Sequence, residues 1–237
     1  MSLLTICQDA ADVIGFPRPS AIVNSTNQTA RQLLAIVNQE GEQLSKAKNW
    51  SALVSEHTFT LSTSDQDYAL PADFRWIVPN TTWDRSDDRI VLNPITGEEW
   101  QFLKAWTTVA GLNRRARIRD GQLEFEQTIL AADNGKTIAF EYLSKYWADI
   151  SAGGTPKEKF TLDTDVPMID SNLLTLGLIW RFRRAKGLEY ESELAEYQAQ
   201  VMLTKAGDGG ARRLNMGSKN MFELTDPNVP ESGYAGI

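Results

Sequence analysis

The chain has 237 residues, of which 42% are hydrophobic and 23% charged, a composition typical of soluble globular proteins large enough to bury a core. It has one cysteine, Cys7, and one histidine, His57. A single cysteine excludes a disulfide within the chain, and so few thiols and imidazoles disfavour zinc sites and catalytic triads. Because no apolar stretch approaches the roughly 18 residues that span a bilayer, and Met1 to Gly15 lack secretory signal features, we predict neither membrane insertion nor export.

The charge balance is acidic, with a formal net charge of -7 from 24 basic and 31 acidic residues. Proteins that grip nucleic acid gain affinity by neutralising phosphates, so their surfaces are usually basic. The acidic balance therefore disfavours tight DNA binding. It is compatible with a protein past which DNA moves without adhering, and composition alone does not separate this role from plain solubility.

The N-terminal part predicts two helices. Apolar residues between Leu3 and Ile14 recur at helical spacing, which predicts a short amphipathic helix. The Gly15-Phe16-Pro17-Arg18-Pro19 segment ends it, because proline fixes φ and lacks an amide donor. Ser25 and Gln28 then have the spacing of a capping box, and the apolar stripe that follows predicts a second helix to about Lys48.

The middle of the chain predicts β-structure. From about Leu53 the hydrophobic period changes to two, and residues 57–61 alternate as a half-buried strand does. Two dipeptides, Asp120-Gly121 and Asn134-Gly135, suit hairpin turns because their residues tolerate positive φ. They separate three β-like runs at 115–119, 122–130 and 136–146. We therefore predict a three-stranded antiparallel meander.

Three further helices are predicted outside these strands. The Thr96-Gly97-Glu98-Glu99 run has the pattern of a capping box and opens a short helix within the β-rich region. Asp170 or Ser171 can cap a later helix that is apolar nearly all round. Gly187 ends that helix, and another follows as far as Gly207, so we predict an antiparallel helical hairpin.

The predicted fold class is α+β, with a helical bundle from the N- and C-terminal helices, an inserted antiparallel β-meander region and an extended C-terminal tail. The bundle comprises residues 1–50 and 160–207, the β-rich region residues 51–159, and the flexible tail residues 208–237. The tail is rich in glycine and has no sustained periodicity, so we expect it to be extended in isolation.

Several motifs invite a chemical interpretation, and a plainer one competes with each. Gly135-Lys136-Thr137 resembles the end of a phosphate-binding loop, but the glycine required five residues upstream is absent. Glu124 and Glu126 have the residue types of a glycosidase pair, and Asp163 and Asp165 those of a metal site. Solvated strand residues explain the two glutamates more simply, and no further ligands at the spacing of a calcium loop follow the two aspartates. We predict no catalytic residue, no cofactor and no metal site, and that the protein is not an enzyme.

Charges of opposite sign gather on the two sides of Gly187. Each sign suits its helix end, because the helix dipole is negative at the C-terminus and positive at the N-terminus. A subunit interface is the second explanation, in which the acidic helix of one copy meets the basic helix of its neighbour. The candidate interface residues are Arg181, Arg183, Arg184, Lys186, Glu189, Glu191, Glu193 and Glu196.

The tail is polarised too, with bases before acids and with apolar residues that have nothing local to pack on. A tail that orders on a partner explains this pattern, and a disordered chain end explains it equally. The residues that would contact such a partner are Arg212, Arg213, Leu214, Met216, Met221 and Phe222.

Short stretches across residues 3–210 carry a family resemblance through their order and texture. They read LLTICQDAA (3–11), GFPRP (15–19), TARQLL (29–34), YALPADF (68–74), TWDR (82–85), WRFRRAKGL (180–188) and ELAEY (193–197). Together they resemble the head-to-tail adaptor, or connector, proteins of short-tailed phages, the podoviruses.

The resemblance implies a structural virion protein that forms a dodecameric ring below the portal, extends the DNA channel and gives the tail a platform. Its partners would be the portal protein, tail nozzle or fibre proteins, further copies of itself, and genomic DNA that passes without specific binding. The C-terminal segment would reach the portal, which makes the six tail residues given above the candidate portal-binding residues. Assembly would take place in the bacterial cytoplasm, and the finished protein would reside at the head–tail junction of the virion.

Two other functions compete with this one. A tail-tube or nozzle component would form rings with tail proteins and ignore the portal. A virion-associated cell-wall glycosidase would depend on an acidic pair such as Glu124 and Glu126.

Overall fold

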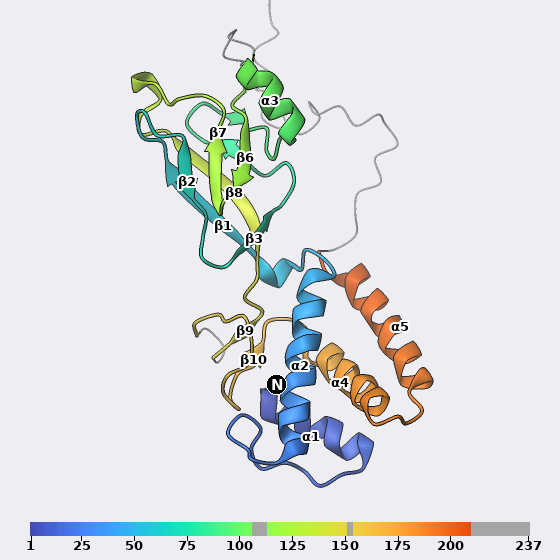
Figure 1. The fold of residues 1–237 in the computed structure, drawn as a ribbon. Helices are drawn as coiled ribbons and strands as arrows, with labels where there is room; N and C mark the ends of the chain where they lie inside the picture. Colours follow the sequence, from blue (N-terminus) through green and yellow to red (C-terminus); the bar gives the residue numbers. More distant parts are fainter. Residues whose placement is uncertain (106–112, 151–153, 210–237) are drawn as a thin grey trace, which may run out of the picture.

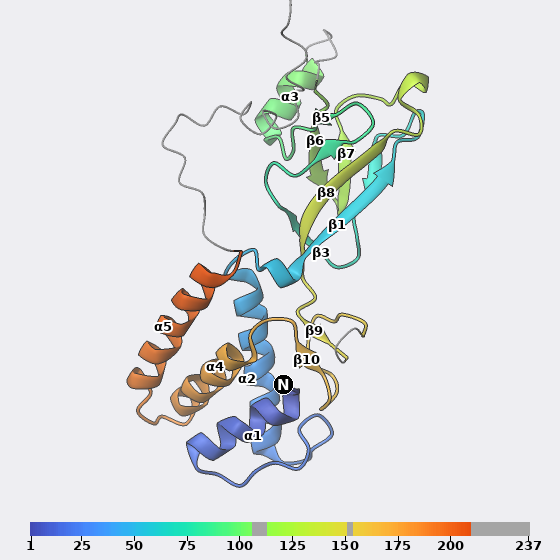
Figure 2. The ribbon, with the colours of Figure 1, turned by 180° about the vertical axis from the view of Figure 1, so that it is seen from behind.

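The computed structural model describes residues 1–105, 113–150 and 154–209. It shows an elongated molecule with most of its helices at one end, which includes the N-terminus, and most of its strands at the other, together with the short helix Gly97–Ala105 (Figures 1 and 2). The predicted α+β class is confirmed. None of the helices within these ranges is long and apolar enough to cross a membrane.

The helical end is organised around one central helix. Its helices are α1 (Leu3–Ile14), α2 (Gln28–Lys46), α4 (Ser171–Ala185) and α5 (Glu191–Gly207). The other three each pack against α4. A short pair of strands, β9 (Ala148–Asp149) and β10 (Val166–Pro167), lies beside them. As its composition predicts, α4 turns buried residues to several sides, including Leu173, Leu178 and Phe182.

Capping side chains set the helix ends. The Ser2 side chain accepts the amide N–H of Thr5, and Gly15 ends α1 in the left-handed conformation with φ of 89°. The predicted capping box at Ser25 is wrong, because Asn27 lies directly before α2 and its Oδ1 accepts the Thr29 amide at 2.8 Å. The Ser25 hydroxyl instead accepts the amide of Asn27, two residues farther along and still outside the helix.

The end of α2 falls at Lys46, slightly before the expected Lys48. The indole N–H of Trp50 donates to the carbonyl of Leu44 at 2.6 Å and so satisfies a carbonyl in the last turn of the helix. A side-chain cap from outside the helix therefore fixes this boundary.

The β-rich end consists of two antiparallel sheets. The larger has the order β1 (Val54–Thr60), β8 (Thr137–Ser144), β4 (Trp83–Asp84) and β5 (Arg89–Ile90), and β3 (Phe74–Ile77) also pairs with β8. The smaller has the order β2 (Asp67–Ala69), β7 (Gln122–Phe125) and β6 (Ala116–Arg119). Helix α3 (Gly97–Ala105) opens with the predicted capping box, in which Thr96 Oγ1 accepts the Glu99 amide and Glu99 Oε2 accepts the Thr96 amide.

The predicted meander is half right. Asp120 and Gly121, with φ of 50° and 75°, form the turn of the β6–β7 hairpin. The second pairing is wrong, because β8 pairs with β1, β3 and β4, whereas β7 pairs with β2. Strand β8 is buried along most of its length on both faces, so it takes a central place in the larger sheet. Gly135 makes only a local bend, with φ of 82°.

Two hydrophobic cores underlie the two ends. One packs the helices around buried residues such as Leu33, Leu174 and Trp147, and the other fills the space between the sheets. Trp147 lies within the segment predicted as β-rich, yet it belongs to the helical core. Gly41 makes room for it, because a Cβ at that position would lie 2.2 Å from the Trp147 ring. The predicted division into a bundle of residues 1–50 and 160–207, a β-rich region of residues 51–159 and a tail of residues 208–237 stays a prediction.

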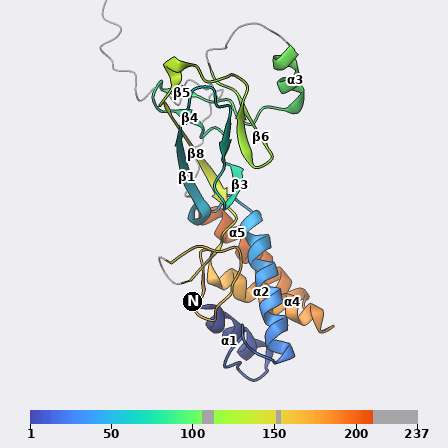
Figure 3. The same ribbon diagram turned by 60° about the vertical axis from the view of Figure 1, so that its left-hand side comes forward.

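The two ends meet at a narrow waist (Figure 3). There Lys48 donates to the carbonyls of Lys205 and Asp208 at 2.7 and 2.5 Å, and it pairs with the Asp208 carboxylate at 3.1 Å. The Ser51 amide also donates to Asp208. The C-terminal end of α5 is thereby fixed next to the C-terminal end of α2, where the chain passes on to β1.

Candidate functional site

The helical hairpin that carries the candidate charges forms as predicted. Asp170 caps α4, with its Oδ1 accepting the Asn172 amide at 2.9 Å. At the other end Gly187, with φ of 70°, reverses the chain, and the Leu188 amide donates to the carbonyl of Arg183. Helix α5 then returns along α4 (Figure 1).

Some of the candidate charges are used inside the chain. Arg183 Nη1 lies 2.6 Å from Glu193 Oε1, an ion pair across the hairpin. Arg181 pairs with Glu40 of α2 and also donates to Gln43. For these arginines and for Glu193, the fold itself explains the charge.

The remaining candidates lie exposed at the tip of the hairpin and the start of α5. They are Arg184, Lys186, Glu189, Glu191 and Glu196. None of them forms an ion pair with a residue in the described ranges; the Lys186 ammonium lies 5.2 Å from the centre of the Phe182 ring. The structure therefore separates the predicted set into charges that hold the fold and charges available to another molecule.

A buried carboxylate holds the hairpin to α2. Glu40 is fully buried and accepts hydrogen bonds from the Arg181 guanidinium and the Tyr197 hydroxyl. Gly177 gives it space, because a Cβ there would lie 2.6 Å from the Glu40 side chain. Burial and the hydrogen bond to Glu40 raise the pKa of Tyr197, so its hydroxyl remains a proton donor. The network has one signal in the sequence, a glutamate beside Val37 and Gly41 on the apolar stripe of α2, and it was not among the predictions.

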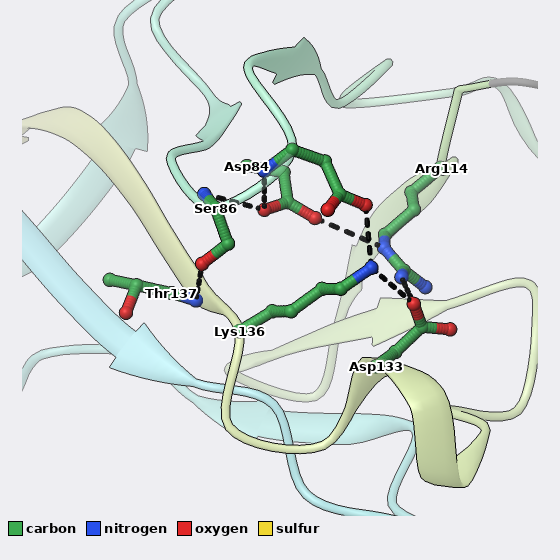
Figure 4. A network of polar contacts seen from close by, with 7 residues as sticks. Asp84, Ser86, Arg114, Asp133, Lys136 and Thr137 are labelled. Atoms are coloured by element: carbon green, nitrogen blue, oxygen red, sulfur yellow. Dashed lines mark hydrogen bonds and ion pairs between the residues drawn. The ribbon is translucent and has the colours of Figure 1, made fainter.

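A second network lines a cavity of about 450 Å³ at the β-rich end. Lys136 Nζ lies 2.6 Å from Asp87 and 2.7 Å from Asp133, and Arg114 approaches Asp133 from the other side at 2.8 Å (Figure 4). Buried Asp84 accepts two backbone amides of its own turn and lies 3.5 Å from Arg114. The network ties the β4–β5 turn to the start of β8.

Two of the residues that resemble a phosphate-binding loop, Lys136 and Thr137, have structural partners instead. Lys136 is engaged by two carboxylates, which raise its pKa, and the Thr137 amide donates to Ser86 Oγ at 3.0 Å. The Lys136 ammonium and the Thr137 amide therefore both bind other groups of the protein.

The carboxylate pairs are likewise engaged in structure. Glu124 pairs with Arg117 at 2.6 Å, and Glu126 lies 3.8 Å from Arg115. Asp163 accepts the amides of Ile22 and Val23 and so fastens the α1–α2 connection.

Asp165 is fully buried and binds Lys157 at 2.8 Å together with two backbone amides. Burial opposes its charge, but these donors outweigh burial and lower its pKa. Within the described ranges no group of His, Cys, Asp and Glu has the arrangement of a metal site.

Neither rare residue is placed for chemistry. Cys7 is buried in α1, and burial raises its pKa to about 12, so the reactive thiolate is suppressed. His57 packs against the rings of Phe59 and Phe140, and burial lowers its pKa. Cys7 therefore belongs to the interior, and half-buried His57 belongs to an aromatic cluster on the sheet.

The candidate portal-binding residues, Arg212, Arg213, Leu214, Met216, Met221 and Phe222, lie outside the described residues. The structure fixes only where this segment starts, beyond Asp208 at the waist.

Comparison with known proteins gives one decisive result. No curated protein matches the chain. The family model described as SU10 adaptor protein matches residues 1–221, which is nearly the whole sequence. The chain therefore belongs to the SU10 adaptor protein family.

Proposed function

We propose that the protein is the head-to-tail adaptor of a short-tailed phage and forms a ring, a dodecamer, below the portal. The observation that carries the proposal is the family match over residues 1–221, which supports an adaptor role in a phage particle and contacts with other virion proteins. In this proposal the ring lies at the head–tail junction, extends the DNA channel and presents a platform to nozzle or fibre proteins.

The shape of the molecule suits this role. Its helical and β-rich ends are distinct units joined at a waist, so one end can contact the portal or neighbouring copies while the other contacts the tail (Figures 1 and 3). The exposed charges at the hairpin tip, Arg184, Lys186, Glu189, Glu191 and Glu196, are free for contacts between copies. A net charge of -7 suits a channel through which DNA slides without strong phosphate contacts.

The role we propose is structural and not enzymatic. The carboxylates that sequence analysis weighed for a glycosidase, Glu124 and Glu126, each lie beside an arginine, which favours a structural use of both. The binding energy of an adaptor comes from repetition around the ring, where many weak contacts act together.

The direct test is to mix the purified full-length protein with portal rings of its own phage and image the product by electron microscopy. We expect an added ring on one face of the portal. Portals that remain bare at saturating protein concentration would overturn the proposal. Rings that form with nozzle protein and not with portal would assign the chain to the tail tube instead.

The tail can be tested separately by deleting residues 210–237, which leaves the Lys48–Asp208 contact intact. We expect portal binding to weaken at least tenfold, because the tail supplies contacts that the folded body lacks. The thermal unfolding of the isolated protein should be unchanged. Undiminished binding would remove the tail from the portal interface.

A further inference from the structure

Helix α5 carries apolar residues on more than one side, so it lacks the single apolar side of an amphipathic helix. None of its residues is buried, although Tyr197 and Val201 pack against the helical core. On its other side Met202 and Leu203 are 71% and 67% exposed, the highest values among large hydrophobic side chains in the described ranges. No charged residue occurs between Tyr197 and Thr204. A helix with apolar residues on both sides is typical of one that is covered on both sides.

The exposed apolar residues form one continuous face. Ala195, Ala199, Met202 and Ala206 follow one another at intervals of four, three and four residues, so they line one side of α5, with Leu203 at its margin. We call these five residues the outer face of α5. Its three alanines allow the axis of a second helix to approach to about 8–10 Å.

The same protein offers a helix of matching character. The exposed side of α2 begins with Arg31, continues with Ala35 and Gln39, and ends with Glu42 and Lys46, which form an ion pair with each other. Arg31 forms no ion pair with a described residue, and the same holds for Glu189 and Glu191 at the start of α5. An unpaired base at the start of one helix is complementary to unpaired acids at the start of the other, and beyond them α2 carries only small, neutral or mutually paired side chains on this side.

The acidic start of α5 and the basic start of α2 lie at nearly the same height along the two helix axes. Within one copy, Glu40 of α2 meets Tyr197 of α5, and Lys48 meets Lys205 farther along, so both helices run toward the waist in register. Counting back from the first contact, Arg31 and Glu191 differ in level by three residues, about 4.5 Å. A rotation about an axis along the helices keeps these levels and sets the α5 of one copy beside the α2 of the next.

We propose that the outer face of α5 packs against the exposed side of α2 in a neighbouring copy, with Glu189 and Glu191 facing Arg31. The contact joins two different surfaces, as the closed ring of the proposed function, on which this inference rests, requires. The competing occupants of the outer face are residues 210–237 of the same chain and the portal.

Disulfide cross-linking on portal rings tests the contact. Gln39→Cys and Ala195→Cys place thiols at nearly the same level on the two proposed surfaces, and buried Cys7 does not compete. An equal mixture of the two variants should give cross-linked dimers, and the double variant a ladder of oligomers. Each single variant should stay monomeric. Val13→Cys, exposed on α1, is the matched control and should give no product with Ala195→Cys.

The outcomes separate this inference from the proposed function. Bare portals would reject the proposed function itself. Complete rings without the Gln39–Ala195 cross-link would reject only the interface, and so would self-cross-linking of Ala195→Cys, which indicates a two-fold contact. Cross-linking of Ala195→Cys to the portal, or to a cysteine placed in residues 210–237 of the same chain, would reject it in favour of the competing occupant.

Charge reversal gives an independent test. Arg31→Glu should lower the yield of rings about tenfold or more, because like charges then meet at every contact around the ring. Combining it with Glu189→Arg and Glu191→Arg should restore the yield. A combined variant as defective as Arg31→Glu alone would overturn the proposed pairing.

Discussion

The two helices of the C-terminal hairpin are neighbours in sequence and opposites in burial. Helix α4 packs against α1, α2 and α5 and buries Leu173, Leu174 and Leu178 completely, whereas α5 has no buried residue. Both are rich in apolar residues. The difference shows that α4 uses them to build the interior of one molecule, while α5 divides them between its own molecule and a surface that faces outward. Predictions for α4 therefore concern stability, and those for α5 concern assembly.

The largest loss of stability should follow truncation of a side chain in α4. Leu178→Ala removes a fully buried side chain from the helical core and should lower the free energy of unfolding by about 2–5 kcal/mol. Urea denaturation of the isolated protein measures this loss. A change below 0.5 kcal/mol, on the order of that for a surface substitution, would contradict the central role of α4.

A smaller loss should come from the contact that holds α5 to the rest. Tyr197→Phe deletes the hydroxyl that donates to buried Glu40 and should cost about 1.5–3 kcal/mol, since hydrogen bonds to charged groups lie in that range. Hydrogen exchange should show α5 opening more readily than α4. Tyr190→Phe is the control, because that ring contacts Trp180 and its hydroxyl is not part of the Glu40 network. Equal effects of both substitutions would argue against a specific clamp.

Local signals in the sequence were sufficient for this hairpin. The cap at Asp170, the turn at Gly187 and the apolar runs between them all act within a few residues of one another, and each was predicted correctly. The same holds for α1 and for the capping box of α3. At α2 two possible caps competed, and Asn27 prevailed because it directly precedes the first helical turn.

Contacts between distant segments could not be derived in this way. A turn such as that at Gly135 fixes the local chain direction but not the partner of the following strand, and β8 found its partners far away in β1 and β3. The Glu40 network joins α2 to residues more than 130 positions later, so no spacing rule predicts it. The exposed set of charges was also indistinguishable from the paired set until the fold placed Glu193 beside Arg183.

The end of α5 should respond to pH more than α4 does. Burial disfavours the Asp208 carboxylate, but hydrogen bonds from Ser51 and Lys48 outweigh this and lower its pKa. A depressed folded-state pKa stabilises the protein above the unfolded value of about 3.9, and this contribution is lost as the pH falls through the folded value. Asp208→Asn should therefore flatten the decline in melting temperature as the pH falls below about 5, where the carboxylate's contribution is lost. Parallel declines in both proteins would contradict this.

The smallest effect on folding should come with a clear effect on assembly. Met202→Ser replaces a side chain that is 71% exposed, so the free energy of unfolding should change by no more than about 0.5 kcal/mol. Ring formation on portals should nevertheless decline, because the substitution removes apolar surface from every contact around the ring. Val13→Ser, which replaces an exposed apolar side chain on α1, is the matched control and should leave both quantities unchanged. If Met202→Ser assembled normally while Leu178→Ala still unfolded easily, α5 would be an ordinary surface helix, and the contrast between the two helices would concern packing alone.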